Sequence, residues 1–481
     1  MLNPLTLPNI PNFVGRAREL CLLHQISTKN ESSIITVYGR RRVGKTELIQ
    51  KAYGDRTLLK FEGIEGQSDA FQRKTFLTTL AKYTGDAALN YAETANWFQV
   101  FDLLAPYVKQ GSVTIFLEEL QWMANYESEL IGCIKYAWDN YFKSNPNLIL
   151  ILCGSSASFI IKEVVQSRAL YNRSSYEIPL LPFTLDETKE FFGIAASKNY
   201  VMDAYLSVGG IPEYLKKLKN ETSVYLGLMK NSFYKESAFR FEFDKIFVSS
   251  FKDNPNYRKT IEFLSKKRFA SRPEILKFLE KSSGGNISNV IEDLELCQII
   301  NSYTPFNQPE SQLLKRYEIS DPFIQYYIKF IKPEINQIEK NQFLQNPERA
   351  MPVDLWKQFL GYSFERFCKY NTEAIAKILG FNGIQYKVGS FYSKVTKSND
   401  PGFQIDLIYA RSDKVMTVCD IKYKDERYDL NDANGFLKSL EQLPKENNRY
   451  VQKVLISSSD PTETVLSNGC FDRVIKIEDL F

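Results

Sequence analysis

A run of six residues with strand character, Ser33-Ile-Ile-Thr-Val-Tyr38, leads directly into Gly39-Arg40-Arg41-Arg42-Val43-Gly44-Lys45-Thr46. The second segment fits the pattern GxxxxGK(S/T), and an amphipathic stretch, Glu47 to Ala52, follows it. A strand, a glycine-bounded loop and a helix in this order form a phosphate-binding unit. The order predicts that the loop lies at the carboxyl end of a buried strand and at the N-terminus of a helix.

Each residue type in this loop serves phosphate binding. The glycines allow backbone N–H groups to wrap the phosphates, and the N-terminus of the following helix favours negative charge. We expect Lys45 to neutralise the β- and γ-phosphates and Thr46 to ligate Mg²⁺. Residues 39–46 are therefore the candidate ATP site, and the alternative interpretation is a chance match to the pattern.

Two further apolar runs, Val113–Leu117 and Leu148–Leu152, have the character of buried strands, and helix-like stretches lie between them. This alternation predicts a parallel sheet covered on both faces. Because parallel strands end at one edge, polar residues that follow them should meet there. We expect Glu118 to reach Mg²⁺ through water, Glu119 to orient the attacking water, and the hydroxyls of Ser155 and Ser156 to sense the γ-phosphate; the alternative for the two acids is a solvated turn.

Arg173, in Leu170-Tyr-Asn-Arg173, is a candidate arginine finger. A finger that acts on a neighbouring copy would require a homo-oligomer. The alternative is an ordinary surface salt bridge.

Composition excludes several classes of protein. The 481 residues carry 61 basic and 57 acidic side chains, a net charge of +4, and 44% of them are hydrophobic, which excludes wholesale disorder. One histidine, His24, excludes metal sites that need two imidazoles. The seven cysteines form no CxxC pair, so we expect mostly buried thiols. The N-terminal residues lack the features of a signal peptide and no apolar run could span a membrane, so we expect a cytoplasmic protein without a membrane partner.

Several of these segments together resemble the archaeal-type ATPases, a branch of the AAA+ superfamily close to the STAND NTPases. The resemblance covers about residues 10–330 and rests on the phosphate loop, Glu119, Gly154-Ser155-Ser156, Asn12-Phe-Val-Gly-Arg16-Ala-Arg-Glu19-Leu20 and Gly209-Gly210-Ile-Pro212-Glu-Tyr214-Leu. It implies that Val14 and Gly15 line the adenine and that Pro212 lies near the nucleotide. The family usually has Asp where this chain has Glu118, and Gly where it has Asn172, and these departures concern the rate of hydrolysis more than nucleotide binding.

A basic segment with a three-helix pattern lies between Lys252 and Lys281. Nine basic residues face four acidic ones there, a local balance of +5, and a short extended stretch, Ile299 to Thr304, follows. This pattern is typical of a winged helix, which the family resemblance also implies. We expect such a face to bind DNA phosphates without base readout; the alternative is a solvated lysine-rich face that packs on the ATPase.

A second constellation lies near the C-terminus. Gly402-Phe-Gln-Ile-Asp406-Leu-Ile-Tyr409 and Val415-Met-Thr-Val-Cys-Asp420-Ile-Lys422 flank a short turn, which predicts a hairpin centred on Asp413. In that register Asp406 lies opposite Asp420, and Lys422 points to the same face. Two carboxylates and a lysine inside apolar strands are costly without a partner, and Mg²⁺ or Mn²⁺ would supply one.

This segment resembles the PD-(D/E)xK nucleases, although Ile405 replaces the common proline and Asp420 the commoner glutamate. The resemblance implies that Asp406 and Asp420 hold the metal, that Lys422 positions the attacking water, and that an upstream helix adds Glu365 as a further ligand. The alternative is a structural Asp–Lys pair. Segment Asp321–Phe330 is similar to the connector that precedes this domain in some archaeal-type ATPases.

The sequence thus predicts an α/β protein with a P-loop AAA+-type core (1–180), a helical lid (181–245), a winged-helix module (246–310), a connector (311–350) and a restriction-endonuclease-like domain (351–481). The leading hypothesis is an ATPase coupled to a metal-dependent nuclease that acts on DNA. The main alternative is a nucleotide-gated regulatory protein whose nuclease-like domain does not cleave, and a third is a P-loop chaperone that acts on proteins.

Overall fold

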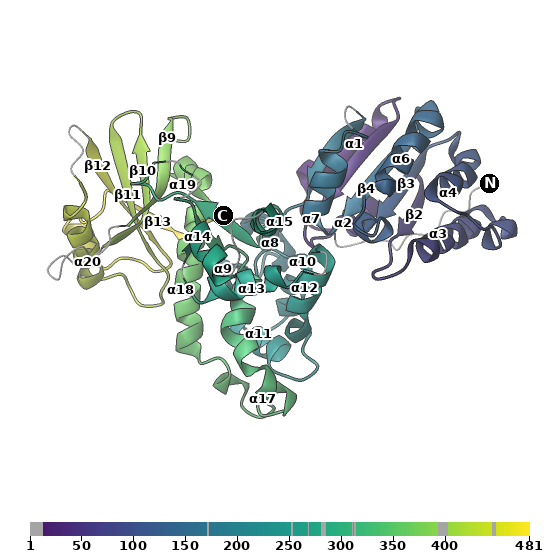
Figure 1. Cartoon of the computed structure of the whole chain (residues 1–481). Helices are drawn as coiled ribbons and strands as arrows, with labels where there is room; N and C mark the ends of the chain where they lie inside the picture. Colours follow the sequence, from purple (N-terminus) through teal and green to yellow (C-terminus); the bar gives the residue numbers. More distant parts are fainter. Residues whose placement is uncertain are drawn as a thin grey trace. The chain divides into compact units, whose positions relative to one another are not determined.

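The computed structural model describes residues 13–170, 173–251, 254–267, 269–279, 285–309, 311, 314–392, 403–444 and 449–481. The chain divides into two compact units (Figure 1). The first unit comprises Met1–Phe183, Ile211–Glu213 and Asp244–Asn254. The second comprises Thr184–Gly210, Tyr214–Phe243 and Pro255–Phe481.

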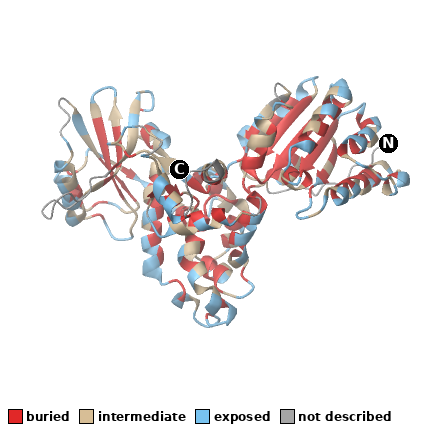
Figure 2. Cartoon of the chain, in the orientation of Figure 1, coloured by how far each residue is buried: buried red, intermediate tan, exposed pale blue. Residues whose placement is uncertain are grey.

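A five-stranded parallel sheet forms the centre of the first unit, in the order β2-β3-β4-β1-β5. The strands are β1 (Ser33–Tyr38), β2 (Thr57–Glu62), β3 (Val113–Glu118), β4 (Ile149–Gly154) and β5 (Ser174–Pro179). This confirms the parallel sheet that the apolar runs predicted. β3 and β4 are buried at every residue (Figure 2). The two strands that the sequence did not reveal, β2 and β5, lie at the edges of the sheet.

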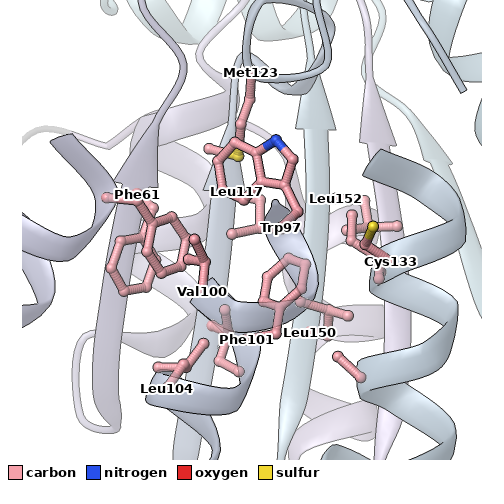
Figure 3. Packing of buried hydrophobic residues seen from close by; sticks show 14 of the residues in the cluster. Phe61, Trp97, Val100, Phe101, Leu104, Leu117, Met123, Cys133, Leu150 and Leu152 are labelled. Carbon is pink, nitrogen blue, oxygen red and sulfur yellow. The ribbon is translucent and has the colours of Figure 1, made fainter. Parts of the chain in front are cut away.

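Helices and an aromatic cluster cover this sheet. The helices are α1 (Ala17–Thr28), α2 (Lys45–Tyr53), α3 (Asp69–Thr84), α4 (Trp97–Leu104), α5 (Leu120–Met123), α6 (Glu129–Asn140) and α7 (Ala157–Phe159). Phe61 of β2 stacks on Phe76 of α3 with ring centroids 3.8 Å apart, and Trp97 meets the edge of Phe76 at 5.8 Å. Figure 3 shows Phe61, Trp97 and Phe101 in this core. Six of the seven cysteines are buried, as expected of thiols packed as small apolar groups.

Helices dominate the chain after Phe183, where the sequence predicted a helical lid. They are α8 (Leu185–Phe192), α9 (Lys198–Val208), α10 (Pro212–Leu218), α11 (Val224–Ser232) and α12 (Glu242–Ser250). Thr184 begins α8 with a capping box to Glu187. Gly209 ends α9 at φ +73°, where a side chain would be strained, and an added Cβ would lie 3.5 Å from Pro322.

A small module of three helices and three short strands follows. It contains α13 (Pro255–Ser265), β6 (Ala270–Ser271), α14 (Arg272–Phe278), α15 (Gly285–Leu296), β7 (Ile300–Tyr303) and β8 (Arg316–Ile319). The strands form an antiparallel sheet in the order β6-β8-β7. The sequence division placed Arg316–Ile319 in the connector, yet this strand pairs with β7. α16 (Pro322–Tyr326), a helical segment (Tyr327–Ile331) and α17 (Ile335–Glu339) come next.

The C-terminal part of the second unit is built on a mixed sheet in the order β13-β12-β11-β10-β9. Its elements are α18 (Val353–Tyr370), α19 (Thr372–Ile378), β9 (Tyr386–Tyr392), β10 (Gln404–Arg411), β11 (Val415–Lys422), α20 (Leu430–Glu441), β12 (Tyr450–Ser457), α21 (Glu463–Ser467) and β13 (Arg473–Lys476). β10 and β11 pair antiparallel with Leu407 opposite Cys419 and Ala410 opposite Met416. This confirms the hairpin register that the sequence predicted, although Gly402 lies outside the described residues.

Among the helices of the described residues, none combines the length and the apolar character that a crossing of the bilayer requires.

Asp203 of α9 gives a stability prediction, because burial raises the pKa of its carboxyl to about 6 although the Tyr423 hydroxyl donates to it at 2.6 Å. An unfolded aspartate has a pKa of about 3.9. Between these values the folded chain binds more protons than the unfolded chain, so the free energy of unfolding decreases as the pH rises from about 4 to about 6.

We expect Asp203→Asn to remove this loss, since the amide is never charged and keeps an acceptor for Tyr423. At pH 7 the variant should be more stable than the wild type by roughly 1–2 kcal/mol, and at pH 4 this gain should vanish. Chemical denaturation at both pH values measures the difference. An equal difference at both would show that ionisation of Asp203 does not cause it.

Candidate functional site

The glycine-bounded loop joins β1 to α2 as the sequence predicted, and both of its glycines are required by the backbone. An added Cβ on Gly39 would lie 2.1 Å from the carbonyl oxygen of Leu180, which follows β5. Gly44 precedes α2 at φ +92°, a conformation that strains other residues. The loop therefore packs closely on the end of the neighbouring strand, and the N-terminus of α2 opens at Lys45.

Lys45 is buried and turns back onto the loop. Its ammonium donates to the carbonyl oxygens of Gly39 at 2.9 Å and Arg40 at 3.0 Å. These bonds satisfy the charge within the loop itself. Phosphate oxygens at the N-terminus of α2 would be stronger acceptors for the same ammonium.

Thr46 and Glu118 lie together beneath the loop. The Thr46 hydroxyl donates to Glu118, and Lys60 of β2 forms an ion pair with the same carboxylate. Burial raises the pKa of Glu118, and Lys60 only partly offsets this effect. A hydroxyl and a carboxylate are hard oxygen donors, so this pair fits the Mg²⁺ ion expected beside Thr46. The sequence interpretation missed Lys60, whose only signal was a charged residue within an apolar strand.

Glu119 is held at the end of β4. Its Oε2 accepts hydrogen bonds from the backbone N–H of Ser155 at 3.1 Å, the hydroxyl of Ser155 at 2.7 Å and the Nε2 of Gln121 at 2.7 Å. Gln121 is fully buried, and an added Cβ on Gly154 would lie 2.6 Å from its amide oxygen. Gly154 thus makes room for Gln121, a residue that the sequence interpretation missed because an isolated glutamine carries no motif.

Ser155 and Ser156 also contact the last turn of α12. The Ser155 hydroxyl lies 3.3 Å from the carbonyl oxygen of Ser249, and the Ser156 hydroxyl donates to that of Ser250 at 2.6 Å. Carbonyls at a helix C-terminus have no partner within the helix. The two serines therefore serve as a cap for α12 in this structure.

Residues of the second constellation gather around β10 and β11. Continuing the register by one residue places Asp406 opposite Asp420, and Lys422 Nζ lies 3.7 Å from Asp420 Oδ1. The buried hydroxyl of Tyr428 donates to Asp420 at 2.6 Å, and Gln404 donates to Asp406 at 2.7 Å. Burial raises the pKa of Asp420, and Lys422 and Tyr428 oppose that rise.

Four carboxylates act on Lys422. Burial lowers the pKa of its ammonium, but the attraction of Asp420, Asp406, Glu365 and Asp432 outweighs burial, so the pKa is raised overall. Glu365 of α18 thus belongs to the electrostatic surroundings of Lys422, and its role as a metal ligand stays a prediction. The structure adds Asp432 of α20, which the sequence interpretation missed and which bonds to Lys424. Among the described residues, however, no three His, Cys, Asp or Glu side chains form a group that could hold a metal ion.

Residues 13–218 match a family model described as an ATPase domain predominantly from Archaea. This segment is an archaeal-type ATPase domain. The match confirms the family expectation for the first part of the chain, and residues 219–481 lie outside it.

Individual known proteins are similar to different shares of this chain. The uncharacterized protein MJECL04 of Methanocaldococcus jannaschii is 26% identical over 417 residues, 86% of this chain and 88% of that protein. The uncharacterized ATP-binding protein MJ0423 of the same organism is 51% identical over 39 residues, 8% of this chain and 66% of that protein. The Walker-type ATPase PABY2304 of Pyrococcus abyssi is similar in structure with a TM-score of 0.49 and 18% identity, over 68% of this chain and 99% of that chain. That score and identity are too low to support a conclusion about this chain.

The N-terminal segment of the ATPase domain is anchored on the phosphate loop. Arg16 donates to the carbonyl oxygen of Val43 at 3.0 Å, and its guanidinium lies 4.6 Å from the centre of the Phe183 ring. Gly15 precedes it at φ +66°. Val14, Gly15 and Pro212 all belong to the same compact unit as the loop. Contact of these three residues with a nucleotide stays a prediction.

Arg173 lies at the opposite end of the sheet from the phosphate loop. It forms a bidentate ion pair with Asp139 at 2.9 and 3.0 Å. The strand that follows it, β5, begins opposite Ile34 at the amino end of β1, whereas the loop follows the carboxyl end of β1. Arg173 is therefore paired within its own unit, and a role as a finger toward a second copy stays a prediction.

Replacement of Lys45 tests the ATP site of the ATPase domain. We expect Lys45→Ala to abolish measurable ATP binding, because Lys45 is the first residue of α2 and its ammonium would neutralise the β- and γ-phosphates. Lys51→Ala on the exposed face of the same helix is the matched control and should bind as the wild type does. Titration with a fluorescent ATP analogue measures both affinities. Unchanged affinity of Lys45→Ala would refute the site.

Replacement of Gln121 tests how Glu119 is positioned. Gln121→Met keeps the length of the side chain but removes the donor at 2.7 Å from Glu119. We expect kcat for ATP hydrolysis to fall about tenfold with little change in KM, since one charge-assisted hydrogen bond orients the carboxylate. Steady-state ATPase assays measure the two constants. A rise in kcat would show instead that Gln121 restrains Glu119 in an inactive position.

Proposed function

We propose that this protein binds and hydrolyses ATP and couples its ATPase domain to a metal-dependent nuclease-like domain that acts on DNA. One observation carries the second half of this proposal: the hairpin register sets Asp406 opposite Asp420, and Lys422 Nζ lies 3.7 Å from Asp420 Oδ1, within a domain that the same chain joins to the ATPase. A lysine among carboxylates at the end of a hairpin is the residue set that metal-dependent cleavage of phosphodiesters needs.

In the ATPase domain we expect the site residues to position ATP and the attacking water and to stabilise the charge that develops on the phosphates. Lys45 and the N–H groups of the loop bind the phosphates of ATP, and Thr46 with Glu118 holds Mg²⁺. Glu119, oriented by Ser155 and Gln121, places the attacking water. The contact of Thr46 with Glu118 supports this assignment, because both oxygens must face one ion.

In the C-terminal domain a bound Mg²⁺ or Mn²⁺ would activate water and stabilise the charge that develops on the phosphate. Asp406, Asp420 and Glu365 would hold it, and Lys422 would position the water. The donors fit such an ion in kind, since all are hard oxygens. They do not fit it in arrangement, because no three gather among the described residues and Asp420 is engaged by Tyr428.

That engagement favours a second candidate function. In it, the nuclease-like domain is a degenerate binding module, and the chain is a nucleotide-gated regulatory or interaction protein. The bond from Tyr428 to Asp420 and the approach of Lys422 satisfy the buried carboxylate without any metal. ATP hydrolysis occurs in both candidates and does not separate them.

The three-helix module is the proposed DNA contact. Its order of helices and its antiparallel sheet β6-β8-β7 support a winged helix. Lys252, Arg268 and Lys281 of the basic face, and Asp253 and Glu280 among its acids, lie outside the described residues. Of the remainder, Lys267 is paired with Glu274 at 2.7 Å, so part of the positive charge is already neutralised. A face that packs on the ATPase is the alternative for this module, and a P-loop chaperone is the third candidate for the whole chain.

The division of the chain is also a proposal. The sequence division is a core (1–180), a lid (181–245), a winged-helix module (246–310), a connector (311–350) and a nuclease-like domain (351–481), and we propose it with one change. The pairing of β8 with β7 supports extending the module past residue 310.

The proposal also includes a cytoplasmic location and a homo-oligomer. An arginine finger at Arg173 would need the second copy.

Cleavage assays distinguish the two candidates. Plasmid and single-stranded DNA are incubated with Mg²⁺ or Mn²⁺, with and without ATP. We expect cleavage by the wild type, and at least a hundredfold loss in Asp420→Ala and Lys422→Ala, because each removes a group from the reacting site. Glu373→Ala and Lys377→Ala, exposed on α19 of the same domain, are matched controls and should cleave normally. No cleavage by the wild type, or equal cleavage by all variants, would contradict the nuclease and leave the regulatory candidate.

A further inference from the structure

A cleft of about 540 Å³ lies within the second unit, next to the proposed nuclease residues. Its walls are the last residues of α13, the helical segment Tyr327–Ile331 and one face of α18. An ion pair between Glu262 and Lys332, 2.5 Å apart, joins the first two of these walls. The proposed function uses Glu365 and the basic face of the three-helix module, but it assigns no ligand to the cleft itself.

Positive charge dominates the lining of the cleft. Five basic side chains and two carboxylates line it; the basic ones are Lys266, Lys267, Lys329, Arg366 and Lys369. Within the part of the chain that the structure describes, Lys266, Lys329 and Lys369 have no carboxylate within ion-pair distance. Lysines that line a concave surface and have no partner acids attract a polyanion. When they neutralise its phosphates, the counterions bound to the polyanion are released.

An aromatic ring stands among these lysines. Tyr362 of α18 lines the cleft, and 48% of its surface is exposed. Proteins that bind single strands combine a positive groove that follows the backbone with aromatic rings on which bases stack. A base within a duplex is already stacked and paired, so its faces are not offered to such a ring.

One end of the cleft is lined by a candidate metal ligand, Glu365. Gln358, Tyr362 and Glu365 line it and also line a second cleft of about 710 Å³ that contains Tyr423 and Lys424. Tyr423 directly follows Lys422, and Glu365 acts on the Lys422 ammonium. A strand that lies along the lysines would therefore reach Glu365, at the boundary between the two clefts.

We propose that this cleft binds a single strand of nucleic acid, with the phosphates on Lys266, Lys329 and Lys369 and a base on Tyr362, and that it leads the strand to Glu365. The inference rests on the proposed function in one respect, the delivery of the strand to a cleaving site. Binding in the cleft requires no cleavage. The class of substrate that it names is an unpaired strand rather than a duplex.

Binding of labelled oligonucleotides of twelve nucleotides to the full chain, measured by fluorescence anisotropy, tests the proposal. The probes are an oligo-dT strand, the matching RNA strand and a DNA duplex of the same length. We expect the wild type to bind the strands more tightly than the duplex. Lys329→Glu and Lys369→Glu should each weaken binding about tenfold or more and lower the salt dependence by about one ion. Tyr362→Ala should weaken it by roughly fivefold to a hundredfold without changing the salt dependence.

Two controls carry the same substitutions outside the cleft. Lys377→Glu on α19 and Tyr450→Ala, whose ring is 63% exposed at the start of β12, should bind as the wild type does. The proposal is overturned if the wild type binds neither strand, if the duplex is preferred, or if the cleft variants bind as the controls do. If binding depends on the cleft residues but no cleavage occurs in Mg²⁺ or Mn²⁺, the result supports strand binding in the cleft and contradicts only the proposed nuclease activity. The RNA and DNA probes decide which strand is preferred.

Discussion

Parallel pairing of three buried strands is the constraint on which the ATPase domain depends. β1 pairs with β4 so that Tyr38 lies opposite Gly154, and β3 pairs with β4 so that Leu117 lies opposite Leu152. The residues after these strands must then share one edge. This edge therefore contains the phosphate loop, Glu118, Glu119 and Ser155, because the register of the parallel strands places their carboxyl ends side by side. Side-chain contacts adjust the positions of these residues, but the pairing of the strands determines that they lie together.

The central parts of the fold could be predicted from sequence because burial leaves a simple pattern. β3 and β4 are buried on both faces and are therefore continuously apolar. β2 and β5 lie at the edges, where alternating polar residues such as Lys60 and Glu177 hide the pattern. The hairpin register was predictable for a different reason: its turn is short, and a short turn fixes which residues face one another. β8 was not predicted, because it has only four residues, two of them charged, and so shows no clear strand pattern in the sequence.

The candidate sites divide in the same way. Residues that belong to a motif, such as Lys45 and Thr46, were predictable by number. Lys60, Gln121 and Asp432 were not, because each reaches its partner across the fold and nothing in the local sequence marks it. The structure also qualifies what the motif suggested at the C-terminus. Asp420 lies where the sequence placed it, but the buried hydroxyl of Tyr428 already satisfies one of its oxygens.

The Ser155 hydroxyl carries a single proton. Two acceptors surround it, Glu119 Oε2 at 2.7 Å and the Ser249 carbonyl at 3.3 Å, so it cannot serve both fully at once. In this structure the shorter distance favours the carboxylate, and the end of α12 relies more on Ser156. A hydroxyl shared in this way links the orientation of Glu119 to the end of α12, and the carbonyl that it contacts there lies 94 residues after Ser155. Whatever draws that proton toward one acceptor weakens the hold on the other.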